Sequence, residues 1–480
     1  MANVDWVKPE VSAALADWKA VRAVCAGQTA MKALGKEVLP MPNPTDASSE
    51  NAERYKQYLK RAVFFNATGR TLNSLTGAAY RLDPEIDVSG IDYIAEDADG
   101  KSVSLYQQSQ RVLQDVLMVG RAGLLADYPT TEAPVSKADQ IAGQIRATIS
   151  VYQAESVINW RYVRTGSQYK LSMVVLAETT CVYDGFEEKT IEQRRVLKLE
   201  GAYIVEIWRK DDKKEWALFS SAMPTDGRGN FWKEIPFCFV GAVNNDADID
   251  RAPLADIAML NIAHFCNSAD YEDSVFFVGQ AQPVITGLNQ QWADMLKKDG
   301  VCIGSRTPIP LPENSDFKFV QAEPNTLVKE AMDQKEAQMI ALSARLIEKG
   351  SAVKTATQVR ADSEAEHSVL SLVVENISNA YEKALQWVAL FMNATAKPVF
   401  CINDDFGVDD LTAQDRQQLM AEWQSGLIGK SDARSVLRKA GVIDEDRTDE
   451  DIDAENELDD AGLGLDRVPV VVKKPVPVDA

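Results

Sequence analysis

Histidine is almost missing from this chain: only His264 and His367 occur among 480 residues. Histidine usually supplies the side chain that titrates near neutral pH, and it is a frequent ligand of zinc. Its scarcity argues against a histidine general base and against a histidine-rich metal site. We therefore expect neither in this protein.

Cysteine pairs at metal-binding spacing are also missing. The six cysteines lie in apolar stretches with no C-x-x-C spacing between them: Cys25, Cys181, Cys238, Cys266, Cys302 and Cys401. Scattered cysteines of this kind are typical of reduced thiols in an intracellular protein. We expect no disulfide framework and no zinc site.

Long apolar runs are absent as well. No stretch approaches 18 uncharged apolar residues, the length that would predict a membrane span. The first 30 residues carry Asp5, Glu10 and Asp17 in place of the basic and apolar regions of a signal peptide. The sequence thus predicts a soluble protein made in the cytoplasm.

Basic residues are outnumbered: 51 Lys and Arg face 72 Asp and Glu, giving a net charge of −21. This balance excludes a protein that coats nucleic acid by bulk attraction. The hydrophobic content of 45% and the charged content of 26% are ordinary globular values, and the length suits about three domains or one large composite.

The sequence has no GxSxG, HExxH or GxGxxG motif. Gly429-Lys430-Ser431 resembles the end of a phosphate-binding loop, but Gln424 replaces the required upstream glycine, so a turn between helices is favoured.

Three aspartates, Asp246, Asp248 and Asp250, have the spacing of the first ligands of a calcium loop. Arg251 and Ile257 stand where that loop needs glycine and glutamate. A solvated acidic turn is therefore favoured, with a looser cation site left open. We predict no catalytic residue, no metal and no cofactor, and we keep a hydrolase that uses an Asp/Glu pair as the less favoured alternative.

Apolar periodicity divides the first half into helices and then strands, which predicts an α+β fold. The expected helices span 9–34, 49–79 and 103–119. Short β-rich runs cut by turn residues then predict an antiparallel meander, with strands at 122–128, 171–183, 194–199, 203–209, 215–221 and 235–243.

The second half has a different order. A helix at 253–278 places five residues on one face: Leu254, Ile257, Asn261, Phe265 and Ala269. A compact segment at 279–325 follows, with strands at 283–285, 301–303 and 317–320 around a short helix near Trp292. The remaining elements are helices at 326–348 and about 355–395, a strand at 398–402, and short helices at 411–425 and 430–440.

This order, a helix, a small α/β insertion, a returning helix, a glycine-bearing break and a very long helix, resembles the portal (head-to-tail connector) proteins of tailed bacteriophages. The residues that carry the resemblance lie between about 15 and 445: 55–62 with Asn66, 71–73, 77–81, 120–127, 158–161, 235–237, and 253–256 with Leu260-Asn261. No single piece is diagnostic, but the order and spacing of the pieces together are fairly specific.

The resemblance implies a portal-type fold of several parts, with these residue ranges: 1–250 an α/β wing, 251–278 a first stem helix, 279–325 a small α/β clip, 326–348 a second stem helix, 349–357 a tunnel loop, 358–407 a long channel-to-wing helix and return strand, 408–455 a short helical crown, and 456–480 a disordered acidic and Pro-containing tail. It further implies a homo-oligomeric ring, usually a dodecamer, at one capsid vertex.

The tunnel loop implied by the resemblance contains Lys349, Gly350, Ser351, Ala352, Val353 and Lys354. Its glycine permits a flexible loop, and its two lysines suit light contact with phosphate; an ordinary helix-helix turn with solvated lysines is the alternative. Residues 326–366 hold six basic and seven acidic side chains, a near-neutral balance suited to a channel wall that must not grip DNA. The partner-facing clip residues would be Lys297, Lys298 and Arg306.

As a portal, the protein would serve genome packaging, retention and ejection without being an enzyme. Double-stranded phage DNA would pass through its channel, and it would dock terminase, the major capsid protein, scaffold, and head-completion or adaptor proteins. It would be assembled in the host cytoplasm, become part of the virion and contact no membrane. Another oligomeric virion adaptor protein is the alternative within the same class.

Overall fold

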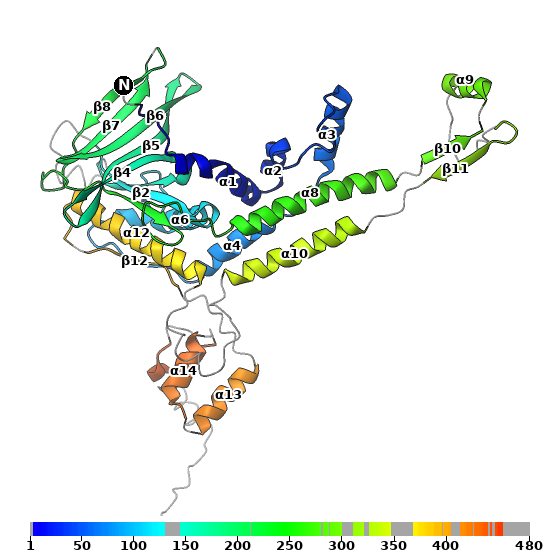
Figure 1. Cartoon of the computed structure of the whole chain (residues 1–480). Helices are drawn as coiled ribbons and strands as arrows, with labels where there is room; N and C mark the ends of the chain where they lie inside the picture. The colour runs from blue at the N-terminus through cyan, green and yellow to red at the C-terminus, as the bar shows by residue number, and fades with distance from the viewer. Residues whose placement is uncertain are drawn as a thin grey trace, which may run out of the picture. The chain divides into compact units, whose positions relative to one another are not determined.

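A computed structural model describes most of the chain: residues 3–129, 145–211, 213–279, 282–287, 289–299, 311–320, 326–346, 368–395, 397–404, 413–425, 427–439, 442–443 and 447–454. The chain divides into two compact units, Met1–Asp405 and Phe406–Ala480. Helices and strands are mixed in the first unit (Figure 1), in agreement with the predicted combination of the two. Among the described residues, no helix has the length and apolar character of a membrane span.

The first predicted helix, 9–34, is two helices. Helix α1 (Pro9–Ala26) ends at Gly27, and α2 (Gln28–Leu34) follows it directly. Gly27 has a φ of 93°, a conformation that residues with a side chain rarely adopt, and its amide donates to the carbonyl of Ala23. Glycine therefore ends a helix that apolar periodicity alone would continue.

The second predicted helix, 49–79, is also two helices: α3 (Ser49–Arg61) and α4 (Ala67–Ala79). Each has its own N-cap, because Ser48 accepts from the amide of Asn51 and Asn66 accepts from the amide of Gly69. The side chain of Asn66 also donates to the carbonyl of Cys25 in α1, which fixes the break.

The strands form two main sheets where one meander was predicted. Strands β2 (Arg121–Asp127), β3 (Thr148–Gln153) and β9 (Phe237–Gly241) form a three-stranded antiparallel sheet in the order β3-β2-β9. The meander is a five-stranded antiparallel sheet of consecutive strands: β4 (Val157–Thr165), β5 (Gln168–Asp184), β6 (Glu187–Glu200), β7 (Ala202–Lys210) and β8 (Trp216–Ala222). Strands β3 and β4 were not predicted, and the runs at 122–128 and 235–243 belong to the other sheet.

A partly buried polar network joins the two sheets. Arg195 on β6 donates to Asp127 on β2 at 2.9 Å and to Glu178 on β5 at 2.8 Å. Tyr152 on β3 donates to Glu178 at 2.5 Å, and Gln193 donates to the same carboxylate at 2.7 Å. Burial raises the pKa of Asp127, against the opposing effect of Arg195. These carboxylates are thus held by partners inside the fold.

Helix α12 (Val369–Phe391) fills the core of the first unit, where it contacts β2, β9 and α6 (Leu105–Val119). It begins at Val369, because Ser368 has an extended backbone and caps it by accepting from the amide of Ser371 at 3.1 Å. The predicted helix from about 355 is therefore wrong at this junction, and its earlier residues, through 367, lie outside the described part. After α12, β12 (Val399–Cys401) pairs with β1 (Glu85–Asp87).

In the described part of the second unit, α13 (Ala413–Gln424) and α14 (Lys430–Lys439) lie close to the predicted bounds, and residues 449–454 are also helical. Helix α14 begins at Lys430, and Gly429 directly precedes it, so the Gly429-Lys430-Ser431 segment lies at a junction between helices. The side chain of Lys430 pairs with Asp453, and Arg434 donates to the same carboxylate at 2.6 Å. Lys430 is thereby engaged in an ion pair of the fold.

Candidate functional site

The second half of the first unit contains an antiparallel helix pair, α8 (Ala255–Val278) and α10 (Leu327–Arg345), which lie side by side in Figure 1. The five residues predicted to share one face of α8 are all buried, each at 1% exposure or less. That face packs against α1, α3 and α4, so the prediction of the buried face is confirmed.

Asn261, at the centre of that face, ties α8 to the junction between α3 and α4. Its side-chain oxygen accepts from the amide of Thr68 at 3.2 Å and from its hydroxyl at 3.0 Å. Its amide nitrogen donates to the carbonyl of Phe65 at 2.7 Å. Asn261 and Thr68 are both fully buried, so these bonds have no competition from water.

Helix α3 holds the second half of α8. Tyr58 donates to Asp270 at 2.6 Å, and burial is the largest cause that raises the pKa of the Tyr58 hydroxyl. Arg61 pairs with Asp273 and lies 4.3 Å from the ring centroid of Phe276. Tyr58 and Arg61 belong to the segment 55–62 that carried part of the resemblance, and both connect α3 to α8 through side-chain contacts.

Helix α10 packs on α8 and α4. His264 of α8 is buried, and its Nε2 lies 3.1 Å from a carboxylate oxygen of Glu336 in α10. The hydroxyls of Thr71 in α4 and Ser343 in α10 lie 2.8 Å apart. A mostly apolar groove of about 520 Å³ runs between α4 and α10. Through its contact with Glu336, His264 connects α8 to α10.

Between the two helices the chain forms a small α/β unit. Strands β10 (Gln282–Thr286) and β11 (Asp316–Val320) pair as an antiparallel hairpin, and α9 (Gln290–Asp299) lies between them in the sequence. The strand predicted at 301–303 lies outside the described residues. Because β10 begins four residues after α8 ends, the unit is attached at the ends of the helix pair.

Of the three predicted clip residues, the structure describes two. Lys297 and Lys298 lie in the last turn of α9 with exposed side chains, where cations are favoured by the helix dipole. Arg306 lies outside the described residues. The structure therefore places two of the three on one short helix.

The predicted tunnel loop, 349–357, lies outside the described residues, as do all six of its named members. The described residues on either side meet: the amide of Leu370 donates to the carbonyl of Leu346 at 3.3 Å. The chain between them therefore begins and ends at one place, next to the start of α12.

Arg121, in the 120–127 segment of the resemblance, is an unusual buried cation. It is 2% exposed, and its guanidinium carbon lies 4.2 Å from the Trp160 ring centroid and 4.0 Å from that of Phe239. Its Nε and Nη2 atoms have no hydrogen-bond partner among the described residues. Burial lowers the pKa of Arg121 to about 10, against the opposing effect of acidic groups that include Asp246.

In the acidic turn after β9, aspartate carboxylates accept hydrogen bonds from backbone amides of the same segment. Asp246 accepts from the amide of Asp248 at 2.7 Å, and Asp250 accepts from the amide of Val243 at 2.7 Å. Among the described residues, no group of three or more His, Cys, Asp or Glu has the arrangement of a metal site. These aspartates shape the loop beside Arg121.

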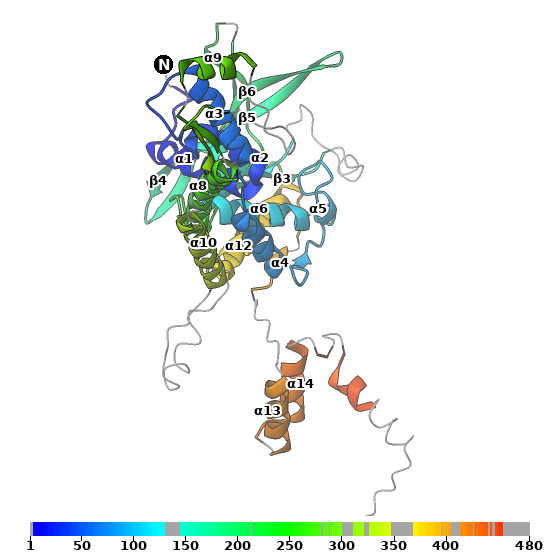
Figure 2. The same cartoon turned by 90° about the vertical axis from the view of Figure 1, so that its right-hand side faces the viewer.

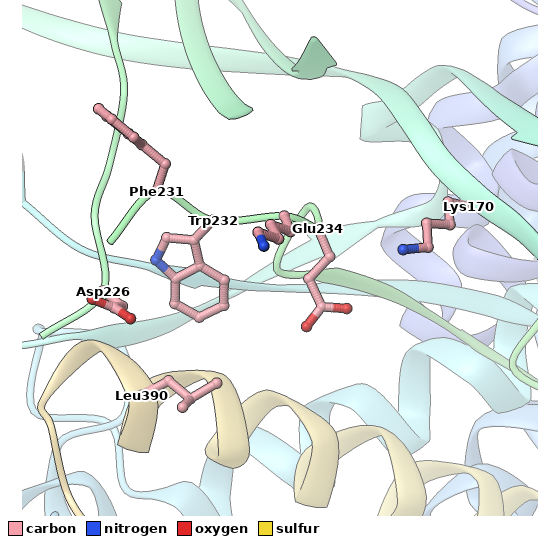
Figure 3. Close-up of a pocket in the computed structure, with 7 residues that line it drawn as sticks. Lys170, Asp226, Phe231, Trp232, Glu234 and Leu390 are labelled. Atoms are coloured by element: carbon pink, nitrogen blue, oxygen red, sulfur yellow. The ribbon is translucent and has the colours of Figure 1, made fainter. Parts of the chain in front are cut away.

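A cavity of about 270 Å³ lies between β5, the segment before β9, and α12 (Figure 3). Two carboxylates line it, Glu234 and Asp226. Glu234 accepts from Trp387 at 2.9 Å. Burial alone would raise the pKa of Asp226, but hydrogen bonds from Asn230 and from backbone amides lower it. Both carboxylates are thus engaged in the fold.

A family model described as "Domain of unknown function (DUF4055)" matches residues 253–392, which begin just before α8 and end just after α12. None of the curated proteins matches the chain.

The chain is similar to several solved structures. One is "Virion of native gene transfer agent (GTA) particle", at 15% identity and a TM-score of 0.40 over 80% of this chain and 92% of that one. Another is "Neck of empty GTA particle computed with C6 symmetry", at 14% identity and a TM-score of 0.41 over 79% of this chain and 92% of that one. A third is "Neck of native GTA particle computed with C12 symmetry", at 16% identity and a TM-score of 0.40 over 77% of this chain and 89% of that one. At these identities and TM-scores the likeness establishes no function.

Proposed function

We propose that this protein is a portal subunit: a structural component of a ring-shaped channel at one capsid vertex, through which double-stranded DNA is packaged, retained and released. The observation that carries the proposal is the arrangement of the second half. Two helices pack antiparallel, a small α/β unit is attached at their ends, and the chain leaves α10 and returns to α12 at one point.

The positions of the residues that carry the resemblance support this proposal. Tyr58, Arg61 and Asn261 hold α8 against the N-terminal helices. Gly120 has a φ of 77°, and an added Cβ would lie 2.4 Å from the carbonyl oxygen of Asp250. These residues fix how α8 is attached to the rest of the unit, which is what a channel built from repeated subunits needs.

The charge balance of α10 supports a channel wall. The described residues 326–346 contain three basic and three acidic side chains. A neutral helix neither traps nor strongly repels a passing phosphate backbone. In this role the subunit needs no chemistry of its own, and terminase would supply the energy for packaging.

In the proposed particle, α8 and α10 are the stem, and the hairpin unit with Lys297 and Lys298 is the clip that faces terminase and then head-completion proteins. The described part of Phe406–Ala480 is the crown. The tunnel loop would expose Lys349 and Lys354 to DNA.

Negative-stain imaging of the purified protein tests the proposal. We expect rings of about twelve subunits with an axial hole. A homogeneous monomer under assembly conditions would contradict the proposal.

The lysines of the tunnel loop allow a separate test. Phage particles carrying Lys349→Ala and Lys354→Ala together are expected to package or eject DNA more slowly, because two phosphate contacts per subunit are lost. Lys101→Ala, in an exposed turn between α5 (Tyr93–Glu96) and α6, is the control for removing a lysine elsewhere. Normal packaging and ejection by the double variant would exclude the phosphate contact, whereas the proposal of a ring-shaped channel would still stand.

A further inference from the structure

The five-stranded sheet has more open edges than its two outer strands. Strand β5 pairs with β4 only as far as Leu176, and β7 pairs with β6 only as far as Gln193. Beyond these points β5 and β6 continue as a two-stranded ribbon, which extends away from the other strands in Figure 2. Residues 177–184 of β5 and 187–192 of β6 therefore each have one edge with no paired strand among the described residues.

Two of the four open edges are protected against pairing. On β4, the amide of Lys8 donates to the carbonyl of Ile158, and the strand carries Arg161 and Arg164. On β6, the open part 187–192 carries four charged side chains. Charged residues and covering segments are the usual means by which proteins prevent edge strands from pairing with another chain.

The other two open edges have no such protection. Strand β8, Trp216–Ala222, contains no charged residue and no proline, and Leu218 and Phe219 on it are 50% and 62% exposed. The stretch 179–183 of β5 is Thr-Thr-Cys-Val-Tyr, with Tyr183 75% exposed. Uncharged, exposed strands of this composition are templates for added strands.

Glu178, the nearest charged residue on β5 before that stretch, does not guard the edge. Its carboxylate accepts from Tyr152, Gln193 and Arg195 in the network between the sheets. No charged side chain therefore guards this edge between Thr179 and Tyr183, before Asp184 at the turn.

We propose that the open edge of β5, residues 177–184, pairs with β8 of the neighbouring copy of this chain, so that the sheet continues from subunit to subunit. The inference rests on the proposed ring and names the surfaces that close it. The two edges lie on opposite margins of the same sheet, and their lengths match: eight residues on β5 and the seven of β8. A head-to-tail contact of two different surfaces is what a closed ring requires.

The contact between copies would be antiparallel, as every strand pair within the sheet is. It would also support the ribbon, since an isolated two-stranded hairpin is at best marginally stable in water.

Disulfide crosslinking through the native Cys181, which is exposed on the ribbon, tests this pairing. Cysteine is introduced on β8 by Ala217→Cys, Leu218→Cys or Ser220→Cys, and the assembled protein is treated with a copper oxidant. Within one copy, β5 and β8 are three strand spacings apart, about 14 Å, which is beyond disulfide reach. A crosslink between Cys181 and β8 therefore reports two copies.

We expect at least one β8 variant to give a ladder of linked subunits on a non-reducing gel, and the ladder to disappear when Cys181→Ser is added. Val163→Cys on the protected edge of β4 is the matched control and should give no ladder. Rings in the micrographs without a ladder from any β8 variant would overturn this inference while leaving the proposed function standing. A dimer band that persists with Cys181→Ser would instead indicate β8 pairing with β8 and would also overturn it. Absence of rings would contradict the proposed function itself.

Discussion

Replacing Asn261 with leucine tests how α8 is attached to the body. Leucine has nearly the same size and keeps the helix, but it removes every hydrogen bond that Asn261 makes. The amide of Thr68 and the carbonyl of Phe65 then lose their side-chain partner inside the fold. The hydroxyl of Thr68 also loses its acceptor, although it can rotate toward another.

The expected loss of stability follows from the two backbone groups. The amide of Thr68 is left without a partner, which costs about 1 to 3 kcal/mol. The carbonyl of Phe65 keeps the amide of Ala67 as a donor, so the lost hydrogen bond from Asn261 costs about 0.5 to 1.5 kcal/mol. The added apolar surface of leucine offsets about 1 kcal/mol. The net expectation is a loss of about 0.5 to 3.5 kcal/mol.

Urea unfolding of the purified protein, followed by tryptophan fluorescence, measures this difference as a lower midpoint. The matched control is Asn267→Leu, six residues later on α8. That side chain is half-buried and has no hydrogen bond to a described residue. We expect the control to change stability by no more than about 0.5 kcal/mol. Equal midpoints for the two variants would refute the anchoring of α8 through Asn261.

Three further predictions concern other parts of the chain. Gly120→Ala should destabilise the protein by more than about 1 kcal/mol, whereas Gly77→Ala, with open space around its Cβ position in α4, should be neutral or stabilising; thermal unfolding compares them. Burial raises the pKa of Cys238 from 9.0 to about 12, so its contribution to stability is complete below about pH 9 and is lost as the pH rises through about 12, and iodoacetamide at pH 8 should leave it unmodified until the protein unfolds. Lys297→Glu with Lys298→Glu should leave rings intact and weaken terminase binding in a pull-down; unchanged binding would remove these lysines from the docking surface.

Local signals in the sequence were sufficient where one element buries one face. The apolar spacing on α8 identified its buried residues correctly, including the polar Asn261 among them. The partners of Asn261 could not be foreseen, because Phe65 and Thr68 lie nearly two hundred residues earlier in the chain. Periodicity finds a face and says nothing about what covers it.

Local apolar periodicity did not predict where helices end or which strands pair. The apolar pattern runs through Gly27 and through the junction before Asn66, so it does not mark where the chain turns. Assigning β2 and β9 to a separate sheet requires knowing contacts between residues more than a hundred positions apart. Strand β4 was missed because its second half is exposed and lacks a buried alternation.

Polar residues inside the fold were the least predictable part. Arg195 and Glu178 look like ordinary charges of an exposed meander, yet they connect two sheets. Arg121 gave a signal only as part of a resemblance, and its position between Trp160 and Phe239 depends on three separate strands.

The most direct test of the central claim is a cryo-electron microscopy reconstruction of the purified, assembled protein. The account predicts a closed ring of about twelve copies, each of 52.9 kDa, with an axial hole wide enough for a DNA duplex and α8 and α10 beside it. A particle with no axial hole, or one in which α8 and α10 lie on the outer rim, would contradict it.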